Sequence, residues 1–360
     1  MRYATELHVA DTTIALDKPT YFIADIASNH DGDLERAKAL IWHVRDAGGD
    51  AAKFQHFTAR DLVSDKGFRQ LDVSAKHQDA WGKSVYDVYE ENEYRREWDD
   101  VLKAECDAAG IHFMTSPYDK AAIDTVDPLV PAFKIGSGDI TTPEILRQIS
   151  MRGKPVFMAT GASSWDDVKR AVDIVLCETP QLALMQCNTN YTGAVENFHH
   201  INLRVLETYK AAWPGMIIGL SDHTPGHATT LAAVTMGARC IEKHFTDDND
   251  RTGPDHPFSM TPKTWAEMVA RTREIEAALG DGIKRVQDNE TETVIVQRRA
   301  LHLERDMKAG DTLSDSDLKS LRPAPADAIL PYQRDDMLGR KLSVDKLAGE
   351  PLKRGDVEAG

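Results

Sequence analysis

Eight short apolar runs punctuate the first 260 residues of the chain, and longer amphipathic segments lie between them. Each run has four to seven residues and is rich in Ile, Val, Phe or Met, which is typical of strands buried on both faces. The pattern predicts strands at Tyr21–Ile26, Ala51–Phe57, Ile111–Thr115, Ala132–Ile135, Pro155–Thr160, Leu182–Cys187, Met216–Leu220 and Arg239–Phe245.

The intervening segments predict helices. Residues 32–47 place Leu34, Ile41 and Val44 on one stripe and end at a glycine pair, and residues 91–109 also end at a glycine. Residues 164–177 open with a serine three positions before Asp167, which resembles a capping box, and residues 229–237 are rich in alanine. Strand–helix alternation repeated eight times favours an α/β fold of the (β/α)8 TIM-barrel type over an open sheet.

The alternation stops near residue 282, so residues 1–282 are predicted to form the barrel domain. Residues 283–297 are polar and charged and are predicted to be a linker. Residues 298–360 contain a strand-like alternation at Arg299–Leu303 followed by short turns, which predicts a small β-rich domain. Within the barrel, the connection between Phe57 and Glu91 is long, and His77, Gln78 and Trp81 suggest an active-site loop there.

Composition narrows the functional classes. The formal net charge of −15 disfavours binding to nucleic acid or to an anionic membrane surface. No apolar stretch is long enough for a signal peptide or a membrane span, and the four cysteines are widely spaced, as reduced thiols are. These features predict a cytoplasmic protein.

Polar and ionisable residues follow or interrupt the predicted strands. Barrel enzymes carry their reacting groups at the carboxyl ends of the strands, where the loops converge. Lys53 and Lys134 lie within strand-like runs, where a buried lysine is costly. Together with the hydroxyls of Ser137, Thr160 and Ser221, they are predicted to form a cage for a phosphate dianion.

Two histidines, His223 and His244, stand at the ends of the last two predicted strands. Their imidazoles are expected to converge on one ion, and two histidines with oxygen ligands suit manganese better than a closed zinc site. Glu242 is expected on the same strand face as His244, as a ligand or as the partner of one.

At these residues the chain resembles the N-acetylneuraminate (sialic acid) synthase family. The matching segments are Ala24–Asp33, Lys53–Gln55, Lys134–Asp139, Ala159–Gly161, Gly219–Thr224, Glu242–Phe245 and Gly253–Asp255. From about Arg298 onward the chain is similar to the small antifreeze-like (SAF) domain, a β-clip, that follows the barrel in this family.

The resemblance implies substrates and roles. Lys53, Lys134, Ser137 and Ser221 would hold the phosphate of phosphoenolpyruvate, with Thr160 and Asn188 as further candidates. His223 and His244 would bind a divalent metal, Mn²⁺ or else Mg²⁺ or Co²⁺, that polarises the aldehyde of an open-chain sugar. Residues of the sugar site would be Gln55, Tyr191, Asp255 and, from the SAF domain, Arg322. The SAF domain would cap the barrel of a partner subunit in a homodimer.

The implied reaction condenses phosphoenolpyruvate with an N-acetylmannosamine-like acyl-amino hexose to give a sialic-acid-like nonulosonic acid and phosphate. A carboxylate would stabilise the cation at C2 and deprotonate the water that adds there, with Asp25 as the first candidate and Asp139 as the second. The family usually has glutamate at both positions and serine in place of Ala159, which leaves the acceptor sugar open. The alternatives are a 3-deoxy-2-keto acid synthase with another aldose acceptor and a non-catalytic sugar-binding barrel.

Overall fold

The computed structural model of the protein describes residues 2–71 and 82–358, so the predicted loop residues His77, Gln78 and Trp81 lie outside the described residues. The chain divides into two compact units, residues 1–280 and 281–360, which are described separately below.

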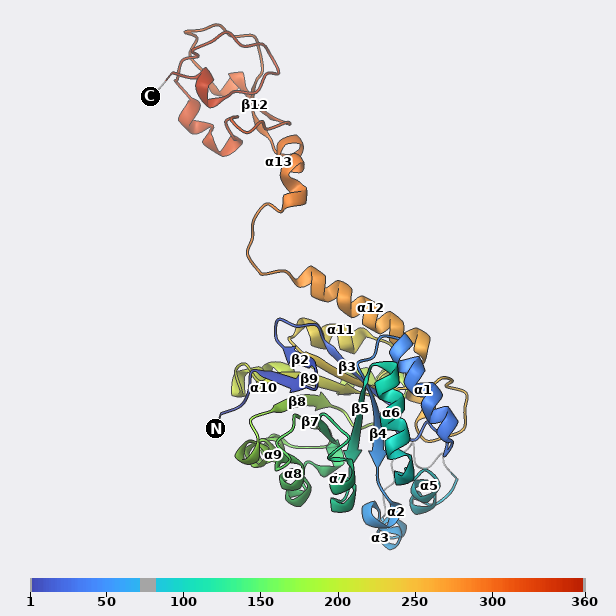
Figure 1. Ribbon diagram of the computed structural model, residues 1–360. Coiled ribbons are helices and arrows are strands. Elements are labelled where there is room, and N and C mark those ends of the chain that lie inside the picture. Colours follow the sequence, from blue (N-terminus) through green and yellow to red (C-terminus); the bar gives the residue numbers. More distant parts are fainter. Residues whose placement is uncertain (1, 72–81, 359–360) are drawn as a thin grey trace. The chain divides into compact units, whose positions relative to one another are not determined.

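The first unit is a closed barrel of eight parallel strands (Figure 1). All eight predicted strands are present and the TIM-barrel prediction is confirmed. In order around the barrel the strands are β10 (Cys240–His244), β3 (Tyr21–Asp25), β4 (Ala51–His56), β5 (His112–Pro117), β6 (Phe133–Ile135), β7 (Val156–Ala159), β8 (Leu182–Cys187) and β9 (Ile217–Asp222).

Helices follow the strands and surround them. They are α1 (Leu34–Asp46), α2 (Ala59–Leu62), α3 (Asp65–Arg69), α5 (Val85–Glu91), α6 (Asp99–Ala109), α7 (Lys120–Val126), α8 (Pro143–Ser150), α9 (Trp165–Glu178), α10 (Val205–Ala212), α11 (Ala228–Thr235) and α12 (Pro262–Leu279). The capping box predicted at Ser164 is confirmed, because its side chain accepts from the Asp167 N–H while the Asp167 carboxylate accepts from the Ser164 N–H. The helix predicted from residue 91 begins later, after a short 3-10 turn at Arg96–Trp98.

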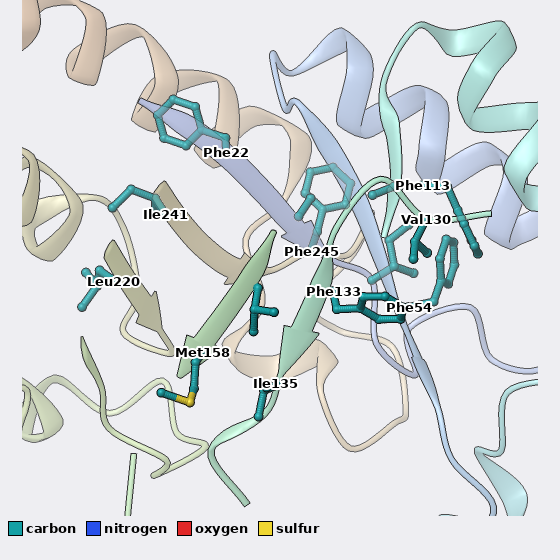
Figure 2. Packing of buried hydrophobic residues seen from close by; sticks show 14 of the residues in the cluster. Phe22, Phe54, Phe113, Val130, Phe133, Ile135, Met158, Leu220, Ile241 and Phe245 are labelled. Atoms are coloured by element: carbon teal, nitrogen blue, oxygen red, sulfur yellow. The ribbon is translucent and has the colours of Figure 1, made fainter. Parts of the chain in front are cut away.

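Side chains alternate along the strands between the outside of the barrel, where they pack against helices, and its interior, where the site residues lie. Residues such as Phe22, Phe54, Phe133 and Ile241 point outward into the layer between strands and helices (Figure 2). Their neighbours on the strands therefore point inward. Near the strand starts these inward residues form an apolar cluster, and near the ends of β3, β4, β6, β9 and β10 they include Asp25, Lys53, Lys134, Ser221 and Glu242.

An N-terminal hairpin closes the barrel at the end where the strands begin. Strands β1 (Glu6–Val9) and β2 (Thr12–Ala15) pair antiparallel. Leu7, Val9 and Ile14 are fully buried in one cluster with inward residues at the strand starts, including Tyr21 and Ala51. The sequence pattern did not predict this hairpin, because its strands are only four residues long.

The second unit has a core of its own, which includes Leu301, Leu303, Leu342 and Leu352. Strands β11 (Ala300–Leu303) and β12 (Leu318–Leu321) pair antiparallel, and short turns make up much of the remainder. The predicted linker contains a helix, α13 (Thr291–Gln297). Across the described ranges 2–71 and 82–358, no helix is long and apolar enough to cross a membrane.

Candidate active site

Four buried charges meet inside the barrel at the carboxyl ends of the strands. The Nζ of Lys53 lies 2.7 Å from Oδ2 of Asp25 and 3.8 Å from Oε1 of Glu242. The Nζ of Lys134 lies 3.3 Å from the same Glu242 oxygen. The side chains of all four residues are at most 5% exposed. These residues, Asp25, Lys53, Lys134 and Glu242, are called the ion cluster below.

Strand register explains the ion cluster. Asp25 on β3 is the direct partner of Lys53 on β4, and Glu242 on β10 is the direct partner of Ser221 on β9. The Ser221 hydroxyl donates to Glu242 over 3.3 Å. Burial alone would lower the pKa of Lys53, but the charges of Asp25 and Glu242 outweigh it and raise that pKa. Lys53 therefore remains charged, and each of the two lysines has a carboxylate within 4 Å of its Nζ.

The histidine pair adjoins the ion cluster. The Nε2 of His244 lies 3.6 Å from Oδ2 of Asp25, and the ring centroids of His223 and His244 are 5.3 Å apart. Tyr191 packs edge-on against the His223 ring at 4.5 Å between centroids. Gln55 donates from Nε2 to Asp25 over 3.1 Å. The predicted phosphate and metal residues thus share one end of the barrel.

The imidazoles fit the role of metal ligands in part. The Nδ1–H of His223 donates to the Asn188 carbonyl over 2.8 Å, a hydrogen bond of the kind that orients metal-bound histidines. The Nδ1 of His244 is buried and accepts no hydrogen bond from any described residue. Residues 2–71 and 82–358 hold no group of three or more His, Cys, Asp or Glu side chains arranged for a metal. The two histidines therefore suit an ion whose other ligands are water and substrate.

The two rings differ in proton affinity. Burial, assisted by the positive charges of His223 and Lys53, lowers the pKa of His244 well below the usual value, so this ring is neutral. Burial also acts to lower the pKa of His223, but hydrogen bonds to Cys187 and to the Asn188 carbonyl outweigh it and raise that pKa. A proton would therefore compete with a bound ion more strongly at His223 than at His244.

A cavity of about 310 Å³ opens beside the ion cluster and the histidine pair. Its described lining is Ser28, Gln55, Phe57, Leu62, Val63, Phe68, Val88, Tyr89, Asn92, Tyr118, Gly136, Ser137, Gly138, Asp139, Tyr191, His244, Pro254 and Asp255. Burial raises the pKa of Asp139 to about 6 against the opposing charge of Lys134. Burial and then the charge of Asp25 raise the pKa of Asp255 to about 6. Two carboxyl groups in this cavity thus titrate near neutral pH.

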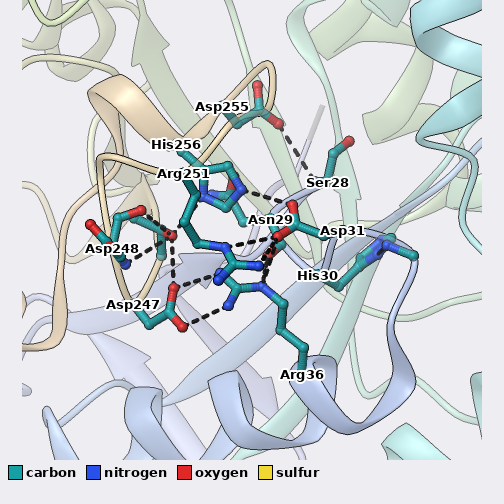
Figure 3. A network of polar contacts seen from close by, with 12 residues as sticks. Ser28, Asn29, His30, Asp31, Arg36, Asp247, Asp248, Arg251, Asp255 and His256 are labelled. Carbon is teal, nitrogen blue, oxygen red and sulfur yellow. Dashed lines mark hydrogen bonds and ion pairs between the residues drawn. The ribbon is translucent and has the colours of Figure 1, made fainter.

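A polar network, drawn in Figure 3, holds Asp255 at the cavity. His256 forms a hydrogen bond at each ring nitrogen. Its Nε2 donates to the Asp31 carboxylate over 2.8 Å, and its Nδ1 shares a hydrogen bond of 2.7 Å with the Thr246 hydroxyl. Arg36 binds Asp247 through two nitrogens, at 2.6 and 2.5 Å, and donates from Nε to a carbonyl of the β3–α1 loop over 2.7 Å. The network joins the loop after β3 to the loop after β10, so both loops are fixed at the site.

Two predicted residues of the barrel, Thr160 and Asn188, have hydrogen-bond partners outside the ion cluster, and Arg322 has its partner within the second unit. The Thr160 hydroxyl donates to the Met185 carbonyl over 3.0 Å and accepts from Tyr209 of α10 over 2.9 Å, so it is engaged between strand and helix. The Asn188 amide is directed to the His200 carbonyl at 3.4 Å. Arg322 belongs to the second unit, where its Nε donates to the Gln297 carbonyl over 2.7 Å.

The remaining predicted residues are at the site, and two features of it were not predicted. Ser137 lines the cavity and its hydroxyl accepts from the Gly161 N–H over 3.0 Å. Glu242 joins both lysines, although only a role beside His244 was expected of it. The apolar residues of the cavity lining were also not predicted. The one hint in the sequence was that the connection after Phe57, which supplies many of them, is unusually long.

Comparison with known proteins assigns the chain to a family. Residues 40–284 match the NeuB family and residues 298–358 match the SAF domain. The chain is 32% identical to the N,N'-diacetyllegionaminic acid synthase of Campylobacter jejuni, over 90% of this chain and 96% of the relative. It is 34% identical to the human N-acetylneuraminate-9-phosphate synthase, over 74% of this chain and 73% of the relative.

Solved structures agree with the sequence comparison. The N-acetylneuraminic acid synthetase of Leptospira borgpetersenii superposes with a TM-score of 0.70 at 28% identity, over 81% of this chain and 96% of that one. The spore coat polysaccharide biosynthesis protein SpsE of Bacillus subtilis superposes with a TM-score of 0.64 at 28% identity, over 99% of both chains. The chain, with its TIM barrel, its SAF domain and the buried charges at the barrel mouth, belongs to the NeuB family of sialic and related nonulosonic acid synthases.

Proposed function

We propose that this protein condenses phosphoenolpyruvate with the open-chain aldehyde of an acyl-amino hexose, such as N-acetylmannosamine, to form a nonulosonic acid and release phosphate. The observation that carries this proposal is the ion cluster beside the histidine pair, on one side of a single cavity. Two buried ammonium groups suit the phosphate of one substrate, and the adjoining cavity suits the sugar. Relatives named as synthases of legionaminic, pseudaminic and N-acetylneuraminic compounds support the same chemistry.

Lys53 and Lys134 would bind the phosphate of phosphoenolpyruvate, with the hydroxyls of Ser221 and Ser137 as further donors. Each lysine already has a carboxylate partner, so the phosphate joins a paired cluster instead of two isolated cations. The carboxylates keep Lys53 charged and hold both ammonium groups inside the barrel before substrate arrives.

His223 and His244 would hold a divalent cation, Mn²⁺ by preference or else Mg²⁺ or Co²⁺. When bound, the ion would supply Lewis-acid polarisation of the sugar aldehyde. C3 of phosphoenolpyruvate then forms a bond to the aldehyde carbon, and positive charge develops at C2.

Asp25 would stabilise that charge and take a proton from the water that adds to C2. Its Oδ2 accepts from Lys53 and from Gln55, which fixes the carboxylate against the ion cluster. As the C–C bond forms, the electron pair of the aldehyde C=O bond moves to its oxygen, which takes up the proton removed from the water and becomes a hydroxyl. Cleavage of the C2–O bond then releases phosphate to the two lysines, and the second proton of the added water leaves with it, so that C2 becomes the keto group. Asp139, which lines the cavity, is the second candidate for the proton transfer.

Gln55, Tyr191 and Asp255 would contact the sugar, since all three line the cavity. Arg322 would reach the sugar from the SAF domain of a partner subunit, in a cytoplasmic homodimer whose SAF domains cap the barrels in trans. A cap that excludes bulk water would strengthen the charged contacts at C2.

The test measures phosphate release from phosphoenolpyruvate by the metal-loaded protein with mannose, N-acetylmannosamine, 2,4-diacetamido hexoses and phosphorylated aldoses, and identifies the products by mass spectrometry. We expect release only when phosphoenolpyruvate, an aldose and a divalent cation are all present. A protein that consumes no phosphoenolpyruvate with any of these acceptors would contradict the proposal.

The metal assignment has its own readout. Replacing His244→Ala should abolish turnover and weaken Mn²⁺ binding measured by calorimetry, while phosphoenolpyruvate binding persists. His227→Ala, on the N-cap of α11, is the matched control. Equal Mn²⁺ affinity in the wild type, His244→Ala and His227→Ala would show that the histidine pair does not bind the metal.

A further inference from the structure

Another buried ion pair lies on the outer side of strands β9 and β10. The Nζ of Lys243 is 2.5 Å from Oδ2 of Asp222, and both side chains are 1% exposed. The two residues are direct partners in the register between the strands. Because side chains alternate along a strand, they point away from Ser221 and Glu242, into the layer between strands and helices. Asp222 and Lys243 are called the outer ion pair below.

The layer that holds the outer ion pair is apolar nearby. Two positions earlier on the same face of the two strands, Leu220 and Ile241 are fully buried among other apolar side chains (Figure 2). A buried ion pair is often no more stabilising than well-packed apolar side chains of similar volume. Stability alone therefore gives little reason for two charges at this place, which points to another role.

The hydrogen bonds of the outer ion pair enclose the backbone of His223. The Asp222 carboxylate accepts from the Thr224 N–H over 3.2 Å and from the Thr224 hydroxyl over 2.8 Å. The Nζ of Lys243 donates to the Thr224 carbonyl over 2.5 Å. His223 lies between these two bonded residues, and Lys243 directly precedes His244 in the chain. One ammonium group thus connects the backbone around the first imidazole to the strand position beside the second.

Helix α11 adds a further contact to the same carboxylate. The Thr229 hydroxyl donates to Oδ2 of Asp222 over 2.6 Å and shares a hydrogen bond of 2.9 Å with the Thr224 hydroxyl. Groups from β9, β10 and α11 therefore meet at one carboxylate. Charge-assisted hydrogen bonds that are shielded from water are strong, so this arrangement makes a rigid connection between the ends of the two strands.

Resting on the metal site proposed above, we infer that Asp222 and Lys243 are positioning residues: they fix the distance between the His223 and His244 imidazoles and thereby set the affinity of the pair for a divalent cation. The ring centroids of the two histidines are 5.3 Å apart. The outer ion pair lies on the opposite face of the strands, so it acts through the histidines and not on the ion itself. Loss of a group that orients a metal ligand typically weakens metal binding by roughly 10- to 100-fold.

The main experiment replaces the outer ion pair by neutral side chains in the double variant Asp222→Asn/Lys243→Met. The net charge is unchanged, so the effects of the two lost charges on a distant cation largely cancel and a change in affinity reports on geometry. Mn²⁺ affinity is measured by calorimetry without substrates, and cooperative unfolding is followed by circular dichroism. We expect Mn²⁺ binding to weaken by roughly 10- to 100-fold in a protein that still unfolds cooperatively.

The matched control is Asp356→Asn/Lys346→Met in the second unit. It makes the same change in another mostly buried pair, whose Nζ and carboxylate oxygen are 2.7 Å apart. Mn²⁺ affinity should equal that of the wild type in this control.

A milder pair of variants on α11 tests the same connection. Thr229→Val removes one hydroxyl from the Asp222 carboxylate at nearly constant shape, and we expect Mn²⁺ binding to weaken by roughly 2- to 10-fold. Thr230→Val makes the same change one position along the helix, where the buried hydroxyl contacts the sulfur of Met268, and should leave the affinity unaltered. If the double variant does not fold, these two threonine variants decide the question.

The outcomes separate this inference from the proposed metal site. Wild-type Mn²⁺ affinity in Asp222→Asn/Lys243→Met, or equal losses in Thr229→Val and Thr230→Val, would overturn the inference alone. A loss of the same size in the second-unit control would do so as well. A wild-type protein that binds no Mn²⁺, or binding that is unchanged in His244→Ala, would overturn the proposed metal site and this inference together.

Discussion

Glu242 contacts both buried lysines and is the residue on which their charge balance depends. Replacing Glu242→Gln leaves the two buried ammonium groups with Asp25 as the remaining carboxylate of the ion cluster. Loss of one partner from a buried ion pair typically costs 3–5 kcal/mol, and because glutamine keeps a hydrogen-bonding oxygen we expect about 2–4 kcal/mol.

Phosphoenolpyruvate should restore part of that stability, since its phosphate supplies the missing negative charge. The measurement is thermal unfolding with and without phosphoenolpyruvate, with the exposed Glu35→Gln as control. A ligand-induced shift in Tm no larger in Glu242→Gln than in the wild type would show that phosphate binds away from the two lysines.

Asp139 predicts a pH-dependent stability. Burial raises its pKa to about 6 from the ordinary value of 3.8, so the folded state binds the proton more tightly than the unfolded state does. Ionised Asp139 therefore reduces stability above about pH 6, and this penalty disappears as the pH falls to about 4. Asp139→Asn mimics the neutral carboxyl, so between pH 4.5 and 7.5 it should gain roughly 1–3 kcal/mol relative to the wild type.

Chemical denaturation at the two pH values checks this difference. The exposed Asp46→Asn serves as the matched substitution. A stability difference between Asp139→Asn and wild type that stays constant with pH would mean that Asp139 is ionised normally in the folded protein.

At the scale of elements, the loops after β3 and β10 depend on each other through Arg36. Its guanidinium binds both oxygens of Asp247 and a backbone carbonyl of the other loop, and a lysine cannot make all three contacts. We expect Arg36→Lys to raise KM for the aldose by roughly 3- to 10-fold, with a smaller change in kcat, because Asp255 loses its fixed position.

Arg69→Lys is the control, since its pair with Asp65 is exposed on the surface. Steady-state kinetics with varied aldose gives both constants. If KM for the aldose changes equally in both variants, or if Arg36→Lys lowers kcat alone, the network does not support sugar binding.

The sequence predicted the repeating strands of the barrel but missed the N-terminal hairpin. All eight barrel strands were found, because strands buried on both faces read as unbroken apolar runs. The hairpin at Glu6–Ala15 was missed, since four-residue strands with a single buried face carry little signal. The strand pattern predicted Lys53 and Lys134 at the barrel mouth and alternation placed Glu242 on the face of His244, but their pairing depends on the register between distant strands, which no local pattern records.

The partners of single side chains are also not readable from the sequence. Thr160 follows β7 directly and stays a predicted phosphate ligand, but in the structure its hydroxyl bonds to the Met185 carbonyl and to Tyr209 of α10. The apolar residues that line the cavity, Phe57, Leu62, Val63, Phe68 and Val88, were not predicted because they are spread along the connection between β4 and α6. Only tertiary packing brings them to the cavity.

At the scale of the whole molecule, the proposed homodimer predicts complementation between two inactive variants. His244→Ala removes a group of the barrel and Arg322→Ala removes a group of the second unit. If each SAF domain completes the partner's site, a mixed dimer has one site with both groups intact. Co-expression should then restore roughly a quarter of wild-type activity by random assortment.

Purified variants assayed separately set the baseline, and analytical ultracentrifugation gives the oligomeric state. Co-expressed variants with no more activity than the sum of the two alone would place Arg322 at the site of its own subunit or at none.

The hairpin that seals the base of the barrel has a consequence for synthesis on the ribosome. Leu7, Val9 and Ile14 emerge first, but the cluster that buries them includes Ile217 and Cys240, which are translated more than two hundred residues later. Strand β3 likewise has no partner on one edge until β10 has been translated and closes the barrel. A nascent chain that stops short of His244 thus keeps an open strand edge and an unseated hairpin, which makes it a natural client for chaperones until the last strand arrives.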